Sequence, residues 1–237
     1  MKRIHFDIID STNDYAKKHL NSLTEGTMID ASFQTNGRGR LNRHWESNKD
    51  NNILVSFILK PIIKASLLQQ LSQVIAKSIM DLLWNDYNLE SKVKWPNDIY
   101  IGNKKIAGIL IETVLSKDGL TGVVVGIGLN VFSNNGIDTA TSLNQHLDIK
   151  DSLDTILFNL RKYLLFNYNQ WITIGYQQIL DFCNEKSYLK NRVININGKK
   201  FKVNYLNHDG YIQMIDEIGE KSYLLVNELS LHNQLNK

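Results

Sequence analysis

The sequence predicts an α+β protein in which a sheet packed with helices precedes a small all-β unit. Strand-like apolar segments lie at residues 4–8, 27–33, 52–59, 99–101, 106–114 and 121–129. Apolar residues recur at helical spacing over residues 66–87, 152–168 and 171–184. After Ser187 the chain changes to short strand-like runs joined by Asn-Gly and Asp-Gly turns, which are typical of a small β-barrel or sandwich. We therefore expect two domains, residues 1–186 and 187–237.

Composition and cysteine content indicate an ordinary globular protein of a reducing compartment. The chain is 43% hydrophobic and 22% charged, and its net charge of +3 is too small to indicate a nucleic-acid ligand by itself. The single cysteine, Cys183, excludes an internal disulfide and lies in an apolar run, which favours a packed core thiol and a cytoplasmic protein. No apolar run approaches the length of a membrane span, and the first residues do not form a signal peptide.

The segment Ser11-Thr12-Asn13-Asp14 is expected to begin the first helix. Ser11 is a favourable N-cap, and Asp14 stands at the third position of a capping box. Two interpretations of residues 11–13 remain open. They form either a plain helix cap or a cluster of small polar groups that binds a polar ligand at the positive end of a helix.

Residues 34–47 place Arg38, Arg40 and Arg43 among glycines and small polar residues, and they end near Trp45. No apolar period would fold this segment into the core. Glycine lets a backbone approach a ligand closely, and arginine presents planar charged forks that match phosphate oxygens. We interpret the segment as a flap that closes over an anion. A solvated basic loop and a nucleic-acid contact are the alternatives.

A hairpin is expected between residues 93 and 114. A Pro-Asn pair at residues 96–97 interrupts its first strand, and a Gly-Asn pair at residues 102–103 turns the chain back. Asp98 and Lys105 therefore belong to one hairpin, where an acid and a lysine could face the same cleft. On this stretch alone, an ordinary hairpin with a charged tip is an equal alternative.

Gly126 and Gly128 alternate within a strand that is expected to be central. Glycine weakens the interior of a strand, so its presence there needs a physical reason. A ligand that lies flat against the bare backbone is one such reason, and a β-bulge is the other.

Four motifs stand in order along the chain. They are the Ser-Thr-Asn helix start, Gln-Thr-x-Gly-Arg-Gly-Arg from Gln34, Lys-Trp-Pro-Asn-Asp from Lys94 with the Lys105 hairpin, and Gly-Ile-Gly-Leu-Asn from Gly126. In this combination the sequence resembles the biotin protein ligase family over essentially its whole length. The resemblance implies a mixed sheet with helices, akin to class II synthetases and lipoate ligases, followed by a small SH3-like barrel.

The resemblance also implies roles for individual residues. The residues expected to bind biotin are Ser11, Thr12, Asn13, Gln34, Arg38, Gly39, Arg40, Lys105, Gly126 and Gly128. The Ser-Thr-Asn segment and Gln34 would hydrogen-bond the ureido ring, and the glycine strand would lie beneath biotin. Lys105 would bridge the biotin carboxyl oxygen and the α-phosphate, and it forms the expected catalytic set with Arg38 and Arg40.

The same resemblance implies ATP as the second substrate and Mg²⁺ as its metal ion. The residues expected to bind the nucleotide are Arg40, Arg43, Trp45, Asn97, Lys105 and Asn130. Trp45 would pack against the adenine once the flap closes, and Asn130 would contact the adenine. Asp98 and Asn97 would orient the phosphates, a magnesium ion or the lysine.

The implied activity joins biotin, through biotinoyl-5′-AMP, to a lysine in the biotin carboxyl carrier domain of a carboxylase. A lipoate or octanoate ligase of the same fold is the first alternative. A non-catalytic biotin sensor or DNA-binding module is the second alternative. The sequence does not identify the acceptor carboxylase.

Two departures from the family pattern bear on these expectations. Many relatives have a third glycine in the flap where this chain has Asn42, so the mobility of the flap is expected to differ. Many relatives also carry an N-terminal helix-turn-helix, whereas only ten residues precede Ser11 here. We therefore expect a monofunctional enzyme without a DNA or membrane partner, and we leave an edge-to-edge homodimer open.

Overall fold

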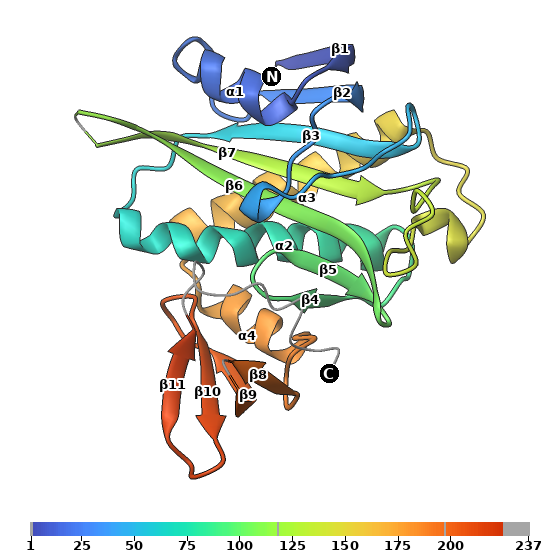
Figure 1. Cartoon of the computed structure of the whole chain (residues 1–237). Coiled ribbons are helices and arrows are strands. Elements are labelled where there is room, and N and C mark those ends of the chain that lie inside the picture. Colours follow the sequence, from blue (N-terminus) through green and yellow to red (C-terminus); the bar gives the residue numbers. More distant parts are fainter. Residues whose placement is uncertain (1, 118, 197, 225–237) are drawn as a thin grey trace.

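A seven-stranded mixed sheet is the main element of the computed structural model, which describes residues 2–117, 119–196 and 198–224 (Figure 1). The strand order is β1-β2-β3-β7-β6-β5-β4; β1 and β2 are parallel, and the other neighbours are antiparallel. The strands are β1 (Arg3–Ile9), β2 (Met28–Gln34), β3 (Asn52–Leu59), β4 (Lys92–Lys94), β5 (Asp98–Ile101), β6 (Lys104–Ser116) and β7 (Gly119–Asn130). The predicted mixed sheet with helices is confirmed.

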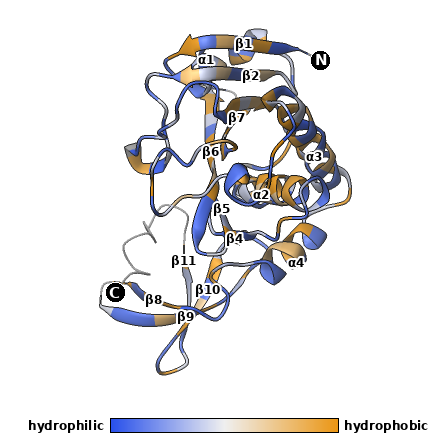
Figure 2. Ribbon diagram, turned by 90° about the vertical axis from the view of Figure 1, so that its right-hand side faces the viewer, coloured by the Kyte–Doolittle hydropathy of each residue, from blue (hydrophilic) through white to orange (hydrophobic). Residues whose placement is uncertain are grey.

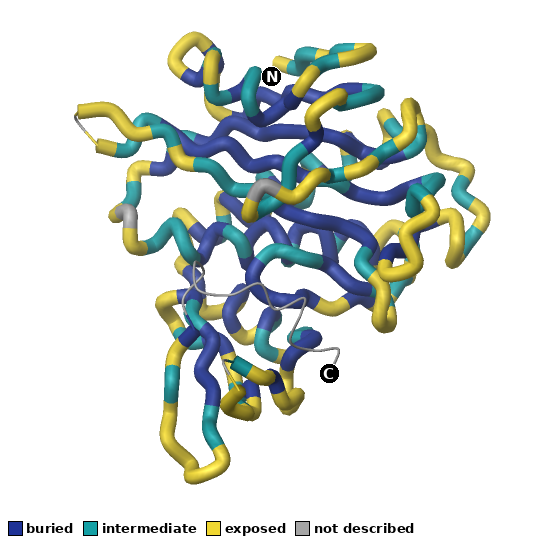
Figure 3. The backbone as a smooth tube through the Cα atoms, in the orientation of Figure 1, coloured by how far each residue is buried: buried dark blue, intermediate teal, exposed yellow. Residues whose placement is uncertain are grey.

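Helices α2 (Leu68–Asn85) and α3 (Leu153–Thr173) cover one face of this sheet, as Figures 1 and 2 show. Successive strand side chains point to opposite faces, so alternate residues of each strand meet these helices. Phe57 of β3, Val125 of β7 and Ile79 of α2 are completely buried in the resulting apolar cluster. Figure 3 shows that burial is concentrated in the central strands and in the helix packed behind them.

Helix α1 (Thr12–His19) packs on the opposite face of the sheet. Ala16 and the following Leu20 form a second apolar cluster with Ile58 of β3 and Val124 of β7. The helix begins at Thr12 because the Ser11 hydroxyl oxygen accepts a hydrogen bond from the backbone N–H of Asp14 at 3.3 Å. This helix contacts β2, β3 and β7. The part of the face towards β5 and β4 is therefore left for other segments.

The predicted helix break between residues 168 and 171 is wrong, because α3 continues to Thr173. Trp171 exposes only 5% of its surface, and its Nε1 donates a hydrogen bond to Gln70 Oε1 of α2 at 2.8 Å. This tertiary contact keeps the turn helical. The chain instead leaves the helix at Gly175, whose φ of +113° favours glycine, before α4 (Gln177–Glu185). Within the described residues, no helix combines the length and the apolar character needed to cross a membrane.

A second, antiparallel sheet of four strands follows α4, in the order β11-β10-β9-β8. Its strands are β8 (Val193–Ile196), β9 (Lys199–Leu206), β10 (Ile212–Asp216) and β11 (Lys221–Leu224). Gly198 and Gly210 occupy turns with positive φ, as the Asn-Gly and Asp-Gly pairs predict. Over the described residues the strands form an open sheet and not a closed barrel. The end of the predicted strand 222–226 lies outside the described residues.

The segment before the second sheet joins the edge of the first sheet at β4. The backbone N–H of Tyr188 donates to the Val93 carbonyl at 2.8 Å, and the Val93 N–H donates to the Lys186 carbonyl at 3.0 Å. These bonds satisfy backbone groups of an edge strand that would otherwise face solvent. The second sheet is thereby fixed beside the hairpin that carries Asp98 and Lys105.

Cys183 should be inert towards thiol reagents in the native protein. Its side chain is completely buried on α4, and burial raises the pKa of its thiol to about 12. We expect Ellman's reagent to label no thiol at mildly alkaline pH, and one thiol per chain after denaturation in urea. Fast labelling of the native protein would contradict the core position of Cys183.

Candidate active site

One face of the large sheet lacks side chains where its central strands meet. Gly128 of β7 lies directly opposite Gly108 of β6, and in the next row Gly126 of β7 lies opposite Ser56 of β3. Directly paired residues share a face, so these glycines leave a depression on the face that carries α1. The depression forms part of a cavity of about 260 Å³. Its wall comes from the start of α1, the loop around residues 38–46, and strands β3 to β7.

Hydrogen bonds between small buried groups fix one end of the cavity, which we call the polar end. Ser56 Oγ lies 2.8 Å from Thr12 Oγ1 and 2.5 Å from Asn13 Oδ1. Gln34 Oε1 accepts hydrogen bonds from the Thr12 backbone N–H at 2.7 Å and from Thr12 Oγ1 at 3.0 Å. Ser11, Thr12 and Asn13 each expose 4% or less of their surface. The helix start is thus both a cap, through Ser11, and a preorganised set of donors and acceptors.

Glu112 of β6 fixes the orientation of the Asn13 side chain at this end. Glu112 Oε2 accepts a hydrogen bond from Asn13 Nδ2 at 2.8 Å. The Asn13 amide lies directly over Gly126, where an added Cβ would come within 2.4 Å of Asn13 Oδ1. The Arg38 guanidinium of the flap reaches the same acids, pairing with Asp14 and lying 3.5 Å from Glu112. The polar end and the flap therefore share one group of carboxylates.

A β-bulge turns Lys105 into the cavity. Tyr100 of β5 lies opposite Lys105, and Ile106 has no partner on β5. The extra residue shifts the alternation of side chains by one position, so Lys105 shares a face with Tyr100 while Ile106 is completely buried in the core. Lys105 Nζ forms an ion pair with Asp98 Oδ1 at 2.7 Å. The prediction that Asp98 and Lys105 meet on one hairpin is confirmed.

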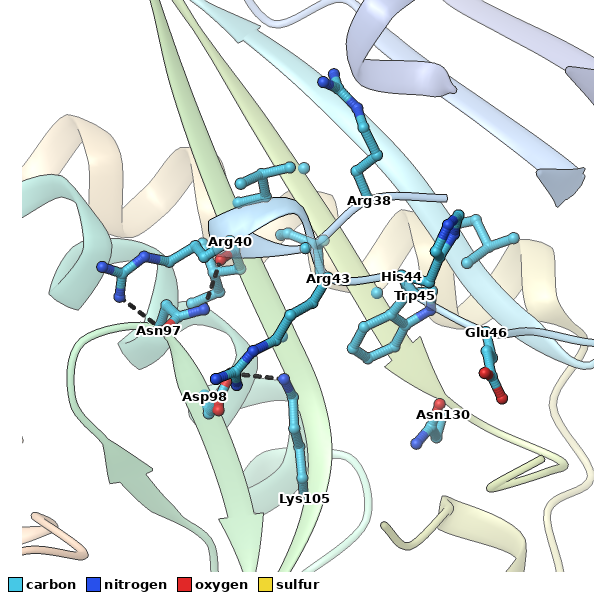
Figure 4. A pocket seen from close by; sticks show the side chains of 18 of the residues that line it. Arg38, Arg40, Arg43, His44, Trp45, Glu46, Asn97, Asp98, Lys105 and Asn130 are labelled. Atoms are coloured by element: carbon cyan, nitrogen blue, oxygen red, sulfur yellow. Dashed lines mark hydrogen bonds and ion pairs between the residues drawn. The ribbon is translucent and has the colours of Figure 1, made fainter. Parts of the chain in front are cut away.

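Positively charged side chains converge on this ion pair at the other end of the cavity, the cationic end (Figure 4). Arg40 lies in a short 3₁₀ turn, η2 (Arg40–Asn42), and donates from Nη1 to Asn97 Oδ1 at 3.2 Å. Figure 4 shows the Arg43 side chain extending to Asp98 and Lys105. Burial lowers the pKa of Arg40, while the charge of Asp98 opposes that shift. This end suits a ligand with several negative charges.

Trp45 covers the cavity from the flap side. Its ring lies against Gly108 and Gly128, where an added Cβ would come within 2.9 Å and 2.3 Å of ring atoms. The ring centre is 5.3 Å from Lys105 Nζ, a cation–π contact. Trp45 Nε1 is buried and has no hydrogen-bond partner among the described residues. A ligand acceptor would satisfy this donor.

Asn130 ends β7 near Trp45 (Figure 4). Its Nδ2 donates to the Thr141 carbonyl at 3.0 Å, whereas its buried Oδ1 has no hydrogen-bond partner in the described part of the chain. A buried acceptor without a partner is costly in free energy. This position therefore favours a ligand that brings a donor.

Asp98 does not belong to a complete metal site. Across residues 2–117, 119–196 and 198–224, no three His, Cys, Asp or Glu side chains form a group that could hold a metal ion. The Asp98 carboxylate already pairs with Lys105. Mg²⁺ is usually bound by one or two carboxylates together with substrate phosphates. Asp98 therefore fits as one ligand of an ion that a nucleotide brings.

Comparison with known proteins shows which protein family this chain belongs to. The model of the biotin/lipoate A/B protein ligase family matches residues 5–130, more than half of the chain. This chain belongs to the biotin/lipoate A/B protein ligase family. The matched span contains the polar end, the flap, the Lys105 hairpin and the glycine strand, so the resemblance that the motifs indicate is confirmed.

Individual members of this family show how far the likeness extends. The bifunctional ligase/repressor BirA of Bacillus subtilis is 33% identical over 183 residues, which are 74% of this chain and 56% of that protein. The biotin–[acetyl-CoA-carboxylase] ligase of Paracoccus denitrificans is 36% identical over 124 residues, which are 52% of this chain and 51% of that protein. The chain thus spans just over half the length of these relatives.

A solved structure shows that the likeness includes the second sheet. The biotin protein ligase from Aquifex aeolicus in complex with biotin and ATP superimposes with a TM-score of 0.84 at 28% sequence identity. The superposition covers 97% of this chain and 97% of that chain. The fold of this family member is therefore that of the Aquifex enzyme from the first strand to the C-terminal sheet.

The structure brings the predicted site residues to the wall of one cavity. They are Ser11, Thr12, Asn13, Gln34, Arg38, Gly39, Arg40, Arg43, Trp45, Asn97, Asp98, Lys105, Gly126, Gly128 and Asn130. They do not form one cluster, because Arg38 points away from Arg40 and Lys105 (Figure 4). The side chain of Asn42, where many relatives have glycine, lies outside the described part of the structure.

Several residues that build the site were not predicted from the sequence, among them Ser56, Lys94, Tyr100, Gly108 and Glu112. Ser56 is the one polar residue in the apolar run 53–59, and Glu112 is the one charged residue in the run 106–114, so the sequence marks both positions as unusual. Lys94 and Tyr100 face the cavity because of the register of β4, β5 and β6. The sequence does not specify that register.

We predict that Gly128→Ala lowers the free energy of unfolding by about 1–3 kcal/mol, because the new Cβ overlaps the Trp45 ring. Urea denaturation measures this change. The same substitution in a Trp45→Ala background should cost much less, since the overlapping ring is gone. Equal costs in the two backgrounds would show that Trp45 does not lie on Gly128.

Proposed function

We propose that this chain activates biotin with ATP and then transfers the biotinoyl group to a lysine of a biotin carboxyl carrier domain. The observation that carries the proposal is one cavity with a preorganised polar end and a cationic end on the same sheet face. Biotin needs the polar end for its ureido ring. It needs the cationic end because its carboxylate must approach the phosphates of ATP. Relatives named biotin ligases, and a similar structure in complex with biotin and ATP, support this choice.

The polar end suits a cyclic urea better than the other acids of the family. A urea has one carbonyl acceptor and two N–H donors. The hydroxyls of Ser11 and Thr12 and the amides of Asn13 and Gln34 supply both kinds of partner. The dithiolane of lipoate and the chain of octanoate have no donor or acceptor to offer these groups, so biotin gains hydrogen bonds here that the other two acids cannot make. In this proposal Gly126 and Gly128 give Asn13 and Trp45 the close approach that shapes the pocket.

The first step is attack of the biotin carboxylate on the α-phosphorus of ATP. A bond forms between a carboxylate oxygen and phosphorus, the bond to the bridging oxygen breaks, and pyrophosphate leaves with the electron pair. Two anions have to meet, so fixed positive charge lowers the barrier. Arg40 and Lys105 supply that charge, and Arg43 extends to the same place. Arg38 instead ties the flap to Asp14 and Glu112, so we assign it to flap closure over biotin.

The nucleotide base is proposed to lie between Trp45 and Asn130. The indole offers a stacking face, and Asn130 Oδ1 offers an acceptor for an exocyclic amino group. A magnesium ion bound to the phosphates would find Asp98 as its carboxylate ligand, next to Asn97, and would neutralise part of the charge.

The second step needs no nucleophile from this chain. The amine of the acceptor lysine attacks the acyl carbon of biotinoyl-5′-AMP, an amide bond forms, and AMP leaves. The mixed anhydride is already a reactive acyl donor, so the enzyme must chiefly exclude water until the acceptor arrives. The flap, including Gly39 and Trp45 at the cavity wall, is suited to this task.

The proposed function also implies a domain organisation, an acceptor protein and a cellular compartment. We propose that residues 1–186 are the catalytic domain and that residues 187–237 are a small SH3-like domain. We propose the carrier domain of a carboxylase as the acceptor and the cytoplasm as the compartment, in keeping with a single cysteine that allows no internal disulfide. The absence of a DNA partner remains a prediction from the sequence, and the oligomeric state remains open.

The proposal predicts biotin-dependent exchange of labelled pyrophosphate into ATP. Lys105→Ala should lower this exchange about a hundred- to a thousandfold, because it removes one charged donor from the developing negative charge. Lys104→Ala is the matched control, since the neighbouring side chain is exposed and should not change the rate. Failure of the wild-type protein to catalyse exchange with any cofactor acid would end the proposal.

Competition between free acids distinguishes biotin from the family's other substrates. A site built to bond the polar groups of its substrate rejects an analogue without them by about 10⁴-fold. We expect that preference for biotin over lipoate and octanoate in kcat/KM of adenylation. Equal or better use of lipoate would move the assignment to the lipoate branch of the family.

A further inference from the structure

Lys94 extends the site by one strand beyond Asp98. Lys94 of β4 pairs directly with Asp98 of β5, Asp98 with Gly108 of β6, and Gly108 with Gly128 of β7. Paired residues share a face, and neighbouring strands lie about 4.8 Å apart. The four residues therefore form one row across the sheet, and Lys94 ends that row at the cavity wall.

The Lys94 side chain is held in an aromatic setting. It exposes 7% of its surface, and its Nζ lies 3.2 Å from Tyr100 Oη. The same atom lies 4.9 Å from the ring centre of Tyr100 and 5.8 Å from that of Tyr188. Tyr188 leads into the second sheet, and its Oη is 3.2 Å from Asn103 Oδ1. The two tyrosines position the ammonium group through one hydrogen bond and two cation–π contacts.

Positive charge exceeds negative charge at this end of the cavity. Burial lowers the pKa of Lys94; Asp98 opposes this shift, and Lys105, Arg192 and Arg43 add to it. Such a cluster is unfavourable in the free protein and favourable when a multiply charged anion binds. Among the described residues that line this end, the carboxylate is Asp98, and the cationic side chains are Arg40, Arg43, Lys94 and Lys105.

Resting on the proposed function, we propose that Lys94 binds the β- and γ-phosphates of ATP and then the pyrophosphate that leaves. Negative charge grows on this leaving group as its bond to the α-phosphorus breaks, so a fixed cation there lowers the barrier to adenylation. Binding of the α-phosphate alone would not require a positive charge on β4, one strand beyond Asp98. The transfer step releases AMP and involves no pyrophosphate, so Lys94 acts in the first step and not in the second.

Lys94→Met tests this inference, because methionine keeps an unbranched apolar side chain and removes the charge. We expect biotin-dependent pyrophosphate exchange to fall about a hundredfold, as for the loss of one donor to a developing charge. Transfer from added biotinoyl-5′-AMP to a carrier domain should keep its wild-type rate. A purely structural role would slow both half-reactions alike, and that result would overturn the inference.

Lys77→Met is the matched control. Lys77 Nζ lies 4.7 Å from the ring centre of Phe182 and forms an ion pair with Asp81, and Lys77 does not line the cavity. Its loss removes a comparable aromatic contact and should leave both half-reactions unchanged. Lys94→Arg keeps the charge and should retain more exchange activity than Lys94→Met. Circular dichroism reports whether each variant folds, and Lys94→Gln, which can still bond Tyr100, is the second neutral variant.

A thermal-shift titration with inorganic pyrophosphate needs no biotin and separates the two proposals. The midpoint of unfolding should rise with pyrophosphate in the wild-type protein and in Lys77→Met, but much less in Lys94→Met. An equal rise in all three proteins overturns the role of Lys94. Absence of biotin-dependent exchange in the wild-type protein instead overturns the proposed function, whatever the titration shows.

Discussion

The lack of side chains on one face of the β6–β7 pair is the constraint on which the site depends. Gly108, Gly126 and Gly128 stand where regular alternation would direct side chains towards α1 and the flap. The Asn13 amide and the Trp45 indole fill those places so closely that a Cβ atom would overlap them. The opposite face of the same strands packs fully against α2 and α3. The larger apolar core therefore lies on one face of the sheet, and the cavity lies on the other, beside the smaller α1 cluster.

Electrostatics divides the flap between the two ends of this cavity. Arg38 is attracted to the carboxylates of Asp14 and Glu112, whereas Arg40 reaches Asn97 and the neighbourhood of Asp98. Two arginines only two positions apart thus bind opposite ends of the site. The flap is held across the cavity by its charges, and Trp45 is placed between them. The same segment therefore both covers the cavity and places positive charge at its cationic end.

The strongly periodic helices and strands, and the segments that form the cavity wall, could be predicted from the sequence. The runs that became β3, α2 and β7 were clear because their whole length carried one pattern, and the motifs located the cavity wall. The helix end at Thr173 was not predictable, because a contact of Trp171 with Gln70 extends α3 past a weak local pattern. The positions of Lys94 and Tyr100 depend on the strand register, which is set by strand pairing and not by local composition.

The bulge at Ile106 makes the length of the Lys105 hairpin as important as its residues. Removing one residue from this turn would restore unbroken alternation between β5 and β6 and exchange the directions of Ile106 and Lys105. An ammonium group would then enter the apolar layer under α2, and an isoleucine would project into the cavity. The number of residues in the hairpin thus decides which side chain reaches the cavity, so a deletion would withdraw the Lys105 ammonium group without replacing any residue of the cavity wall.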